Sequence, residues 1–127
     1  MIAVDTSALI AVVLYEPQAR ACAAALETEN QVIISAGTVA EALIVASGRN
    51  VGAQAEQLIS ELALEVVPVT FDTARRMQQV YRRWGRGNHP ASLNLGDCFA
   101  YDVAKEHGCP LLYIGDDFAK TDIKSVL

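Results

Sequence analysis

Short apolar runs alternate along the chain with longer stretches in which apolar residues recur at helical spacing. The runs predict buried strands at residues 1–4, 31–34, 65–69 and 110–114, with a short edge strand at 122–127. The longer stretches predict helices at residues 6–14, 17–27, 38–46, 52–64, 71–84 and 95–107. Strands that alternate with helices imply right-handed crossovers and a parallel sheet covered on both faces. The pattern therefore predicts an α/β fold in one domain, residues 1–127, with a mostly parallel central sheet of four to five strands.

Polar residues at the edges of these stretches predict where the helices begin and end. Thr6 or Ser7 is expected to cap the first helix, and Pro17 suits the first turn of the second. Thr70 and Asn94 are expected to cap the last two long helices. The segment 85–90, GRGNHP, reads as a loop.

Composition limits the class of protein. The chain is 52% hydrophobic and 20% charged, which favours a folded domain over disorder. No apolar run approaches the roughly 20 residues that cross a bilayer, and no basic leader precedes the apolar N-terminus. The three cysteines lack CxxC spacing, which argues against zinc and for a reducing, cytoplasmic compartment. The net charge of −5 argues against a nucleic-acid binder by itself, although a metal-dependent nuclease must carry extra carboxylates.

Five acidic residues occupy positions that a parallel sheet would bring to one edge. Asp5 follows the first strand, and Asp116 and Asp117 follow the last long strand. Glu41 and Asp97 lie early in the helices that begin at about residues 38 and 95. In open α/β sheets, sites gather beyond the C-terminal ends of the strands. We therefore expect these carboxylates to converge.

Each acid also has a plain structural interpretation. Asp5 is equally suited to start its helix, and Thr38-x-x-Glu41 matches a capping box. The helix dipole would stabilise Asp97, and Asp116–Asp117 alone reads as a solvated turn. Taken together, however, the acids would repel one another without a cation among them. An all-oxygen site favours Mg²⁺, with Mn²⁺ as the alternative.

Three segments carry a resemblance to a known family. MIAVDTSALIAVV, VAEALIVA and NLGDCFAYDVAKEHGCPLLYIGDDFAKTDI resemble the acidic motifs of PIN-domain proteins, and most of all those of the VapC toxins. The resemblance implies a PIN-like three-layer α/β/α sandwich and a Mg²⁺-dependent endoribonuclease, the toxin of a VapBC toxin–antitoxin module. It also implies an RNA substrate such as a transfer RNA (tRNA), a VapB-like antitoxin, a homodimer and a toxin–antitoxin hetero-oligomer, with no membrane partner.

The resemblance also assigns roles to individual residues. Asp5 and Asp97 match the principal metal-binding aspartates. Glu41 matches the acid of the second motif, which holds the metal directly or through water and helps to orient the nucleophile. The fourth catalytic acid is Asp117 or Asp116; Asp117 is favoured because it precedes Phe118 in a DF pair typical of this group. Two further assignments concern side chains near these acids: the hydroxyl of Thr6 would contact phosphate or a metal-linked water, and Asp122 would be a structural cap.

The helix expected at residues 71–84, with the residue pair that follows it, carries half of the ten basic side chains. The four arginines of the helix and the one that follows it form a positively charged stripe: Arg75, Arg76, Arg82, Arg83 and Arg86. Asp72 is the single acid near them in the sequence. Such a stripe is either a solvated face or a surface for RNA phosphates or an acidic partner. Arg82 and Arg86 are the candidate RNA contacts. The Ala-rich early helices are expected to be core, with any excess apolar surface forming a groove or a dimer face.

Two other functions fit parts of the pattern. A phosphoacceptor signalling domain also gathers acids around Mg²⁺, but it has an acidic pair after its first strand and a lysine after its last. Here the acidic pair comes late, and Lys120 lies beyond the turn. The other alternative is a catalytically silent PIN-fold module that binds RNA or protein, which the intact acidic set disfavours.

Overall fold

The computed structural model describes residues 1–127 and contains four strands, six α-helices and one short 3₁₀ helix, η1. In chain order the elements are β1 (Ile2–Val4), α1 (Thr6–Val13), α2 (Ala19–Thr28), β2 (Val32–Ser35), α3 (Ala36–Gly48), α4 (Gly52–Glu61), β3 (Glu65–Val67), α5 (Phe71–Trp84), α6 (Leu95–Glu106), β4 (Leu111–Leu112) and η1 (Phe118–Lys120). The predicted α/β fold is confirmed.

The sheet is parallel throughout, with the strand order β3-β2-β1-β4. In its register, Ala3 of β1 pairs with Ile33 of β2 on one side and with Leu111 of β4 on the other. Because all strands point the same way, the C-terminal ends of β1, β2 and β4 lie at one edge of the sheet. The residues at that edge begin the functional site described below.

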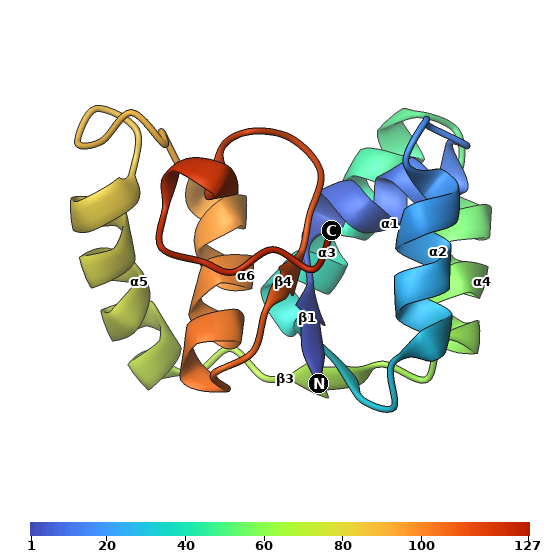
Figure 1. Ribbon diagram of the computed structural model, residues 1–127, viewed down its shortest axis with the longest axis horizontal. Helices are drawn as coiled ribbons and strands as arrows, with labels where there is room; N and C mark the ends of the chain where they lie inside the picture. Colours follow the sequence, from blue (N-terminus) through green and yellow to red (C-terminus); the bar gives the residue numbers. More distant parts are fainter.

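Helices cover both faces of the sheet, which makes the three-layer arrangement visible in Figure 1. Alternate strand residues point to opposite faces. Ala3, Ile33 and Leu111 belong to the apolar cluster that packs against α5 and α6. The neighbouring strand residues, Ile2, Val4, Val32, Ile34 and Leu112, belong to the cluster formed with α1, α2, α3 and α4.

Several predicted boundaries were wrong. Residues 122–127 form no edge strand: the tail runs beside β4 and makes a single parallel bridge, between Leu111 and Ser125. α1 is capped by Asp5, whose side chain accepts from the Ser7 N–H, so neither Thr6 nor Ser7 is the cap. Pro17 lies in the turn before α2, which begins at Ala19.

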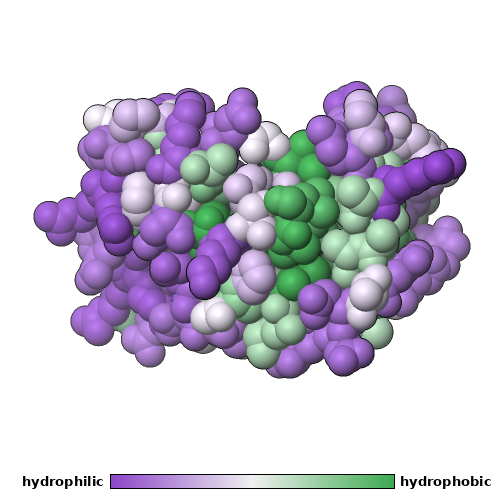
Figure 2. Space-filling model, in the orientation of Figure 1, coloured by the Kyte–Doolittle hydropathy of each residue, from purple (hydrophilic) through white to green (hydrophobic).

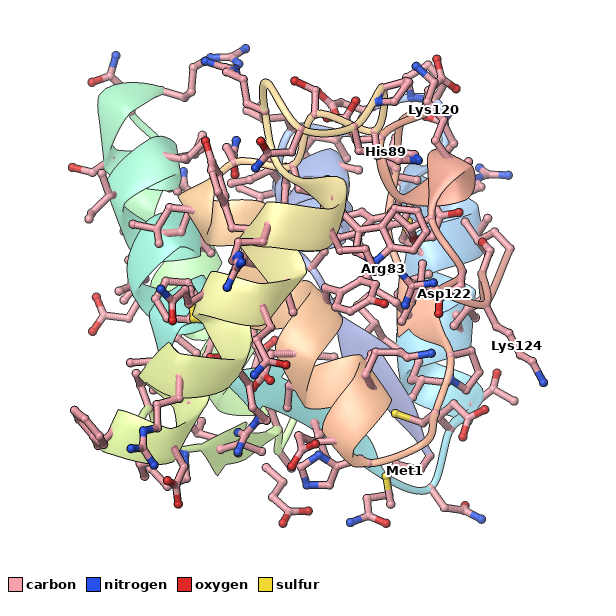
Figure 3. The ribbon with its side chains drawn as sticks, turned by 90° about the vertical axis from the view of Figure 1, so that its left-hand side faces the viewer. Met1, Arg83, His89, Lys120, Asp122 and Lys124 are labelled. Carbon is pink, nitrogen blue, oxygen red and sulfur yellow. The ribbon has the colours of Figure 1, made fainter.

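Ion pairs use two of the five arginines that the sequence placed on a free basic stripe. Arg76 donates from Nε to Oδ1 of Asp102 at 2.8 Å and from Nη2 to Oδ2 at 3.1 Å. Arg83 lies 3.8 Å from Asp122, and Figure 3 shows the two side chains pointing toward each other. The expectation of a single nearby acid was therefore wrong, because packing brings acids of α6 and the C-terminal segment to α5.

Asp122 ties the C-terminal segment to α6. Its Oδ1 accepts from the Tyr101 hydroxyl at 2.5 Å, and its Oδ2 accepts from Lys105 Nζ at 3.1 Å. The Trp84 indole N–H donates to the same hydroxyl at 3.1 Å. The role of Asp122 is thus structural, through side-chain bonds rather than as a helix cap.

The surface shown in Figure 2 carries an apolar stripe, flanked by hydrophilic side chains, where the C-terminal segment meets α1 and α2. Larger exposed apolar side chains also occur elsewhere: Tyr15, Ile44, Phe71 and Leu95 are 67–90% exposed. No helix combines the length and the apolar content that crossing a bilayer requires.

Candidate active site

Asp5 stands at the point where β1 gives way to α1. Its backbone N–H donates to the Leu112 carbonyl of β4 at 3.0 Å, so the residue is fixed to the sheet. Its Oδ2 accepts from the Ser7 N–H at 3.0 Å and from the Ser7 hydroxyl at 2.7 Å. The other oxygen, Oδ1, is buried and has no hydrogen-bond partner. Burial raises the pKa of Asp5 from 3.8 to about 6, and the charges of Asp97 and Glu41 contribute in the same direction.

Glu41 lies on α3, directly opposite the first turn of α6. The predicted capping box was wrong, because α3 begins at Ala36 with Ser35 as its cap, which makes Glu41 the sixth residue of the helix. Its Oε1 accepts from the Thr6 hydroxyl at 2.5 Å. A Cβ atom at Gly96 would overlap the Glu41 carboxylate, so only glycine at position 96 leaves room for it.

Asp97 occupies the third position of α6 and forms a capping box with Asn94. The Asn94 N–H donates to Asp97 Oδ2 at 3.0 Å, and the Asp97 N–H donates to Asn94 Oδ1 at 2.9 Å. Burial raises the pKa of Asp97, the bond from Asn94 lowers it, and the charges of Asp117 and Glu41 raise it further. Asp97 therefore has a structural role at the start of α6, as the partner of the Asn94 cap, and it also lines the pocket with the other acids.

Asp5, Glu41 and Asp97 line one pocket of about 300 Å³ at the C-terminal edge of the sheet; we call it the acidic pocket. Its remaining lining residues are Thr6, Ser7, Ile10, Glu16, Val45 and Ile114. As the side chains lie, no three His, Cys, Asp or Glu residues are grouped closely enough to hold a metal ion. The unpartnered, buried Oδ1 of Asp5 nevertheless fits a cation, because a buried carboxylate oxygen needs a positive or hydrogen-bonding partner.

The two late aspartates do not line the acidic pocket. Asp116 and Asp117 are exposed in the turn between β4 and η1. Asp117 is still close enough for its charge to raise the pKa of Asp97, whereas Asp116 is not among the causes of that shift.

The three candidate RNA contacts have different positions. Thr6 lines the acidic pocket and donates to Glu41. Arg86 lies in the exposed loop after α5, and its charge lowers the pKa of Asp97. Arg82 lies on α5 and lines a different, mostly apolar groove between α5 and α6. Since α5 ends at Trp84, Arg86 does not continue the helical stripe that the sequence suggested.

Three residues in or beside the pocket were not anticipated as functional. Ser7 connects Asp5 to the segment after β4, because its hydroxyl also accepts from the Ile114 N–H at 3.0 Å. Gly96 leaves space for the Glu41 carboxylate, and Glu16 adds a further carboxylate to the wall. Only Ser7 carried a signal in the sequence, as a candidate cap; the other two depend on neighbours from distant segments.

Comparison with proteins of known family identifies the family to which the chain belongs. Residues 2–124 match the model of the PIN domain family. Ribonuclease VapC36 of Mycobacterium tuberculosis is 44% identical over 126 residues, which cover 95% of this chain and 90% of that protein. Ribonuclease VapC30 of the same species is 38% identical over 126 residues, which cover 97% of this chain and 96% of that protein.

Solved structures share the fold. VapC20 of Mycobacterium tuberculosis, described as a toxin that cleaves the sarcin–ricin loop, superposes with a TM-score of 0.82 at 17% identity, covering 99% of this chain and 98% of that one. A chain of a toxin–antitoxin complex from Klebsiella pneumoniae superposes with a TM-score of 0.70 at 22% identity, covering 96% and 93% of the two chains. With this sequence identity and this coverage, the chain belongs to the PIN-domain family and, within it, to the VapC ribonucleases.

Proposed function

We propose that this chain is a Mg²⁺-dependent endoribonuclease, the toxin of a VapBC-type toxin–antitoxin module, that cuts RNA at the acidic pocket. The observation that carries the proposal is the convergence of Asp5, Glu41 and Asp97 from three distant segments on one pocket, with a buried carboxylate oxygen left unpaired. The family supports it, because the relatives that match nearly the whole chain are named ribonucleases.

Each acidic residue of the pocket has its own role in the proposed cleavage. Asp5 and Asp97 would hold Mg²⁺ or Mn²⁺, and Asp117 would add negative charge at the rim. A bound divalent cation supplies charge neutralisation for the phosphodiester and activation of a water molecule. Glu41, oriented by the Thr6 hydroxyl, would accept a hydrogen bond from the attacking water and receive its proton.

RNA would approach from the side of the loop after α5. Arg86 is the cation whose charge reaches the pocket, and we assign it to a phosphate next to the cut. Arg82, which lies outside the pocket, would contact RNA farther along the strand. A tRNA is the substrate that the family suggests.

The test is cleavage of total RNA by the purified, antitoxin-free chain, with cut ends mapped by sequencing. We expect new fragments in Mg²⁺ or Mn²⁺, none in excess EDTA, and full recovery when the cation is restored. Undiminished cleavage in excess EDTA would contradict the metal dependence. RNA binding without any cation-dependent cleavage would favour a silent binding module instead.

Gly96→Ala should reduce cleavage by about tenfold to a hundredfold while the fold is kept, since small misplacements of catalytic groups cost that much. The new methyl group displaces only the end of the flexible Glu41 side chain, so folding is little affected. The matched control is Gly48→Ala, at a position where a Cβ atom meets nothing within 4 Å. Initial cleavage rates and thermal unfolding of both variants provide the measurement; an unchanged rate for Gly96→Ala would count against the role of Glu41.

We further propose that a VapB-like antitoxin covers this toxin, that the toxin forms a homodimer, and that both join in a toxin–antitoxin hetero-oligomer. The support comes from structural neighbours that were solved as toxin–antitoxin complexes. Exposed apolar residues such as Ile44 and Leu95 provide surface that such partners can bury. Size-exclusion chromatography with light scattering, alone and with the antitoxin, measures these assemblies.

A further inference from the structure

Glu16 is a carboxylate of the acidic pocket that the proposed cleavage does not use. The residue is half-buried and lines the same pocket as Asp5, Glu41 and Asp97. Its carboxylate forms none of the side-chain hydrogen bonds or ion pairs of the protein. A polar group in a pocket without a protein partner is available to a ligand.

The end of α1 is shaped so that Glu16 returns to this pocket. The Glu16 N–H donates to the Ala11 carbonyl at 2.9 Å, and the Tyr15 N–H donates to the Val12 carbonyl at 3.3 Å. These two bonds define a Schellman ending, in which the residue before Glu16 takes a left-handed conformation that favours glycine. Tyr15 takes it with φ of 54°, and its side chain is 90% exposed. The two hydrogen bonds of the Schellman ending hold this conformation and thereby fix the backbone of Glu16 at the pocket.

The acidic pocket is lined by residues from both ends of α1. Asp5 precedes the helix and Glu16 follows it, and eight helical residues at 1.5 Å each separate the two by about 12 Å. Apolar side chains of Ile10, Val45 and Ile114 also line the pocket. Glu16 therefore lies at the other end of α1 from Asp5, where the cation is expected.

We propose that Glu16 recognises the base of the nucleotide next to the cut and selects guanine there, an inference that rests on the proposed ribonuclease function. One nucleotide spans a comparable length from its phosphate to the far edge of its base, so a phosphate near Asp5 places that edge near Glu16. The apolar side chains suit the faces of the base.

Guanine is the base whose edge matches a carboxylate. A carboxylate presents two adjacent acceptors and no donor. The Watson–Crick edge of guanine presents two adjacent donors, N1–H and N2–H₂. Cytosine, adenine and uracil have no two adjacent donor groups on this edge, so the second carboxylate oxygen would face an acceptor and be repelled. A carboxylate without a hydrogen-bond donor from the RNA would repel the phosphates and weaken binding. Hydrogen bonds from guanine to Glu16 would offset this repulsion.

The experiment measures cleavage of short RNAs in Mg²⁺, with each of the four bases placed in turn on either side of the cut. The proteins are wild type, Glu16→Gln and the matched control Glu56→Gln, which removes the same charge from an exposed position on α4. We expect wild type and the control to prefer guanine at one of these positions by about tenfold or more, as for one bidentate base contact. Glu16→Gln should lose that preference, and replacing the guanine by inosine, which lacks the N2 amino group, should slow wild type but not the variant.

The outcomes separate the two proposals. Cation-dependent cleavage with no guanine preference, or with a preference that Glu16→Gln retains, overturns the assignment of Glu16 and leaves the ribonuclease function standing. If wild type cuts none of the RNAs in Mg²⁺, the proposed function fails and the role of Glu16 fails with it. A loss of Mg²⁺ affinity in Glu16→Gln, measured by calorimetry, would instead identify a metal ligand and overturn base recognition.

Discussion

Replacing Asp97 by asparagine is expected to reduce RNA cleavage by about a thousandfold or more, as the loss of a catalytic group usually does. The amide oxygen of asparagine can still accept from the Asn94 N–H, so the capping box at the start of α6 is kept. What disappears is the negative charge that faces Asp5 and Glu41 across the pocket. The loss of activity should therefore come without a loss of structure.

The matched control for that variant is Asp72→Asn. Asp72 is likewise an acid in the first turn of a helix, α5, but it does not line the acidic pocket. Cleavage rates in saturating Mg²⁺, together with thermal unfolding and Mg²⁺ binding by calorimetry, distinguish the two. The role of Asp97 would be refuted by an active Asp97→Asn, or by an Asp72→Asn that is equally impaired.

The elements of the fold were predictable because buried parallel strands and amphipathic helices leave different periodicities. α5 matches its predicted range of 71–84, since Thr70 caps it and its apolar stripe is continuous. The start of α3 was missed because β2 passes into it without a loop: Ser35 is both the last strand residue and the helix cap. The edge strand at 122–127 failed because the tail meets β4 at one bridge only.

The site was predictable to the extent that parallel strand order dictates it. Asp5 and the end of β2 had to reach the same edge, and Glu41 and Asp97 join them there. The contribution of Gly96 was invisible, because the constraint comes from the Glu41 carboxylate of another helix. The ion pairs of Arg76 and Arg83 were equally invisible, since their partners lie on α6 and in the C-terminal segment. Contacts between distant segments leave no local pattern in a single sequence, so they could not be predicted from it.

Burial of the Asp5 carboxylate suits it to a cation, but when no cation is bound the buried negative charge should destabilise the protein. With chelator at pH 7, Asp5→Asn is expected to raise the free energy of unfolding by roughly 1–3 kcal/mol, measured by urea denaturation. The upper figure converts the shift in the pKa of Asp5, from 3.8 to about 6, into free energy at about 1.4 kcal/mol per pKa unit. The lower one allows for the amide N–H₂ that asparagine must bury unpaired.

The pH dependence gives this prediction its sign. A carboxyl whose pKa is raised by folding binds its proton more tightly in the folded state, so stability falls as pH rises from 3.8 to about 6 and is level above that. The advantage of Asp5→Asn in stability should therefore shrink as the pH falls through this range and vanish near pH 3.

Asp122→Asn is the control of opposite sign: folding lowers the pKa of Asp122, so this variant should be less stable than wild type at pH 7, with the deficit lost in acid. Added Mg²⁺ should stabilise wild type at pH 7 and leave Asp5→Asn unchanged. An Asp5→Asn protein that is less stable than wild type in chelator at pH 7 would show that the buried carboxylate is satisfied without a cation.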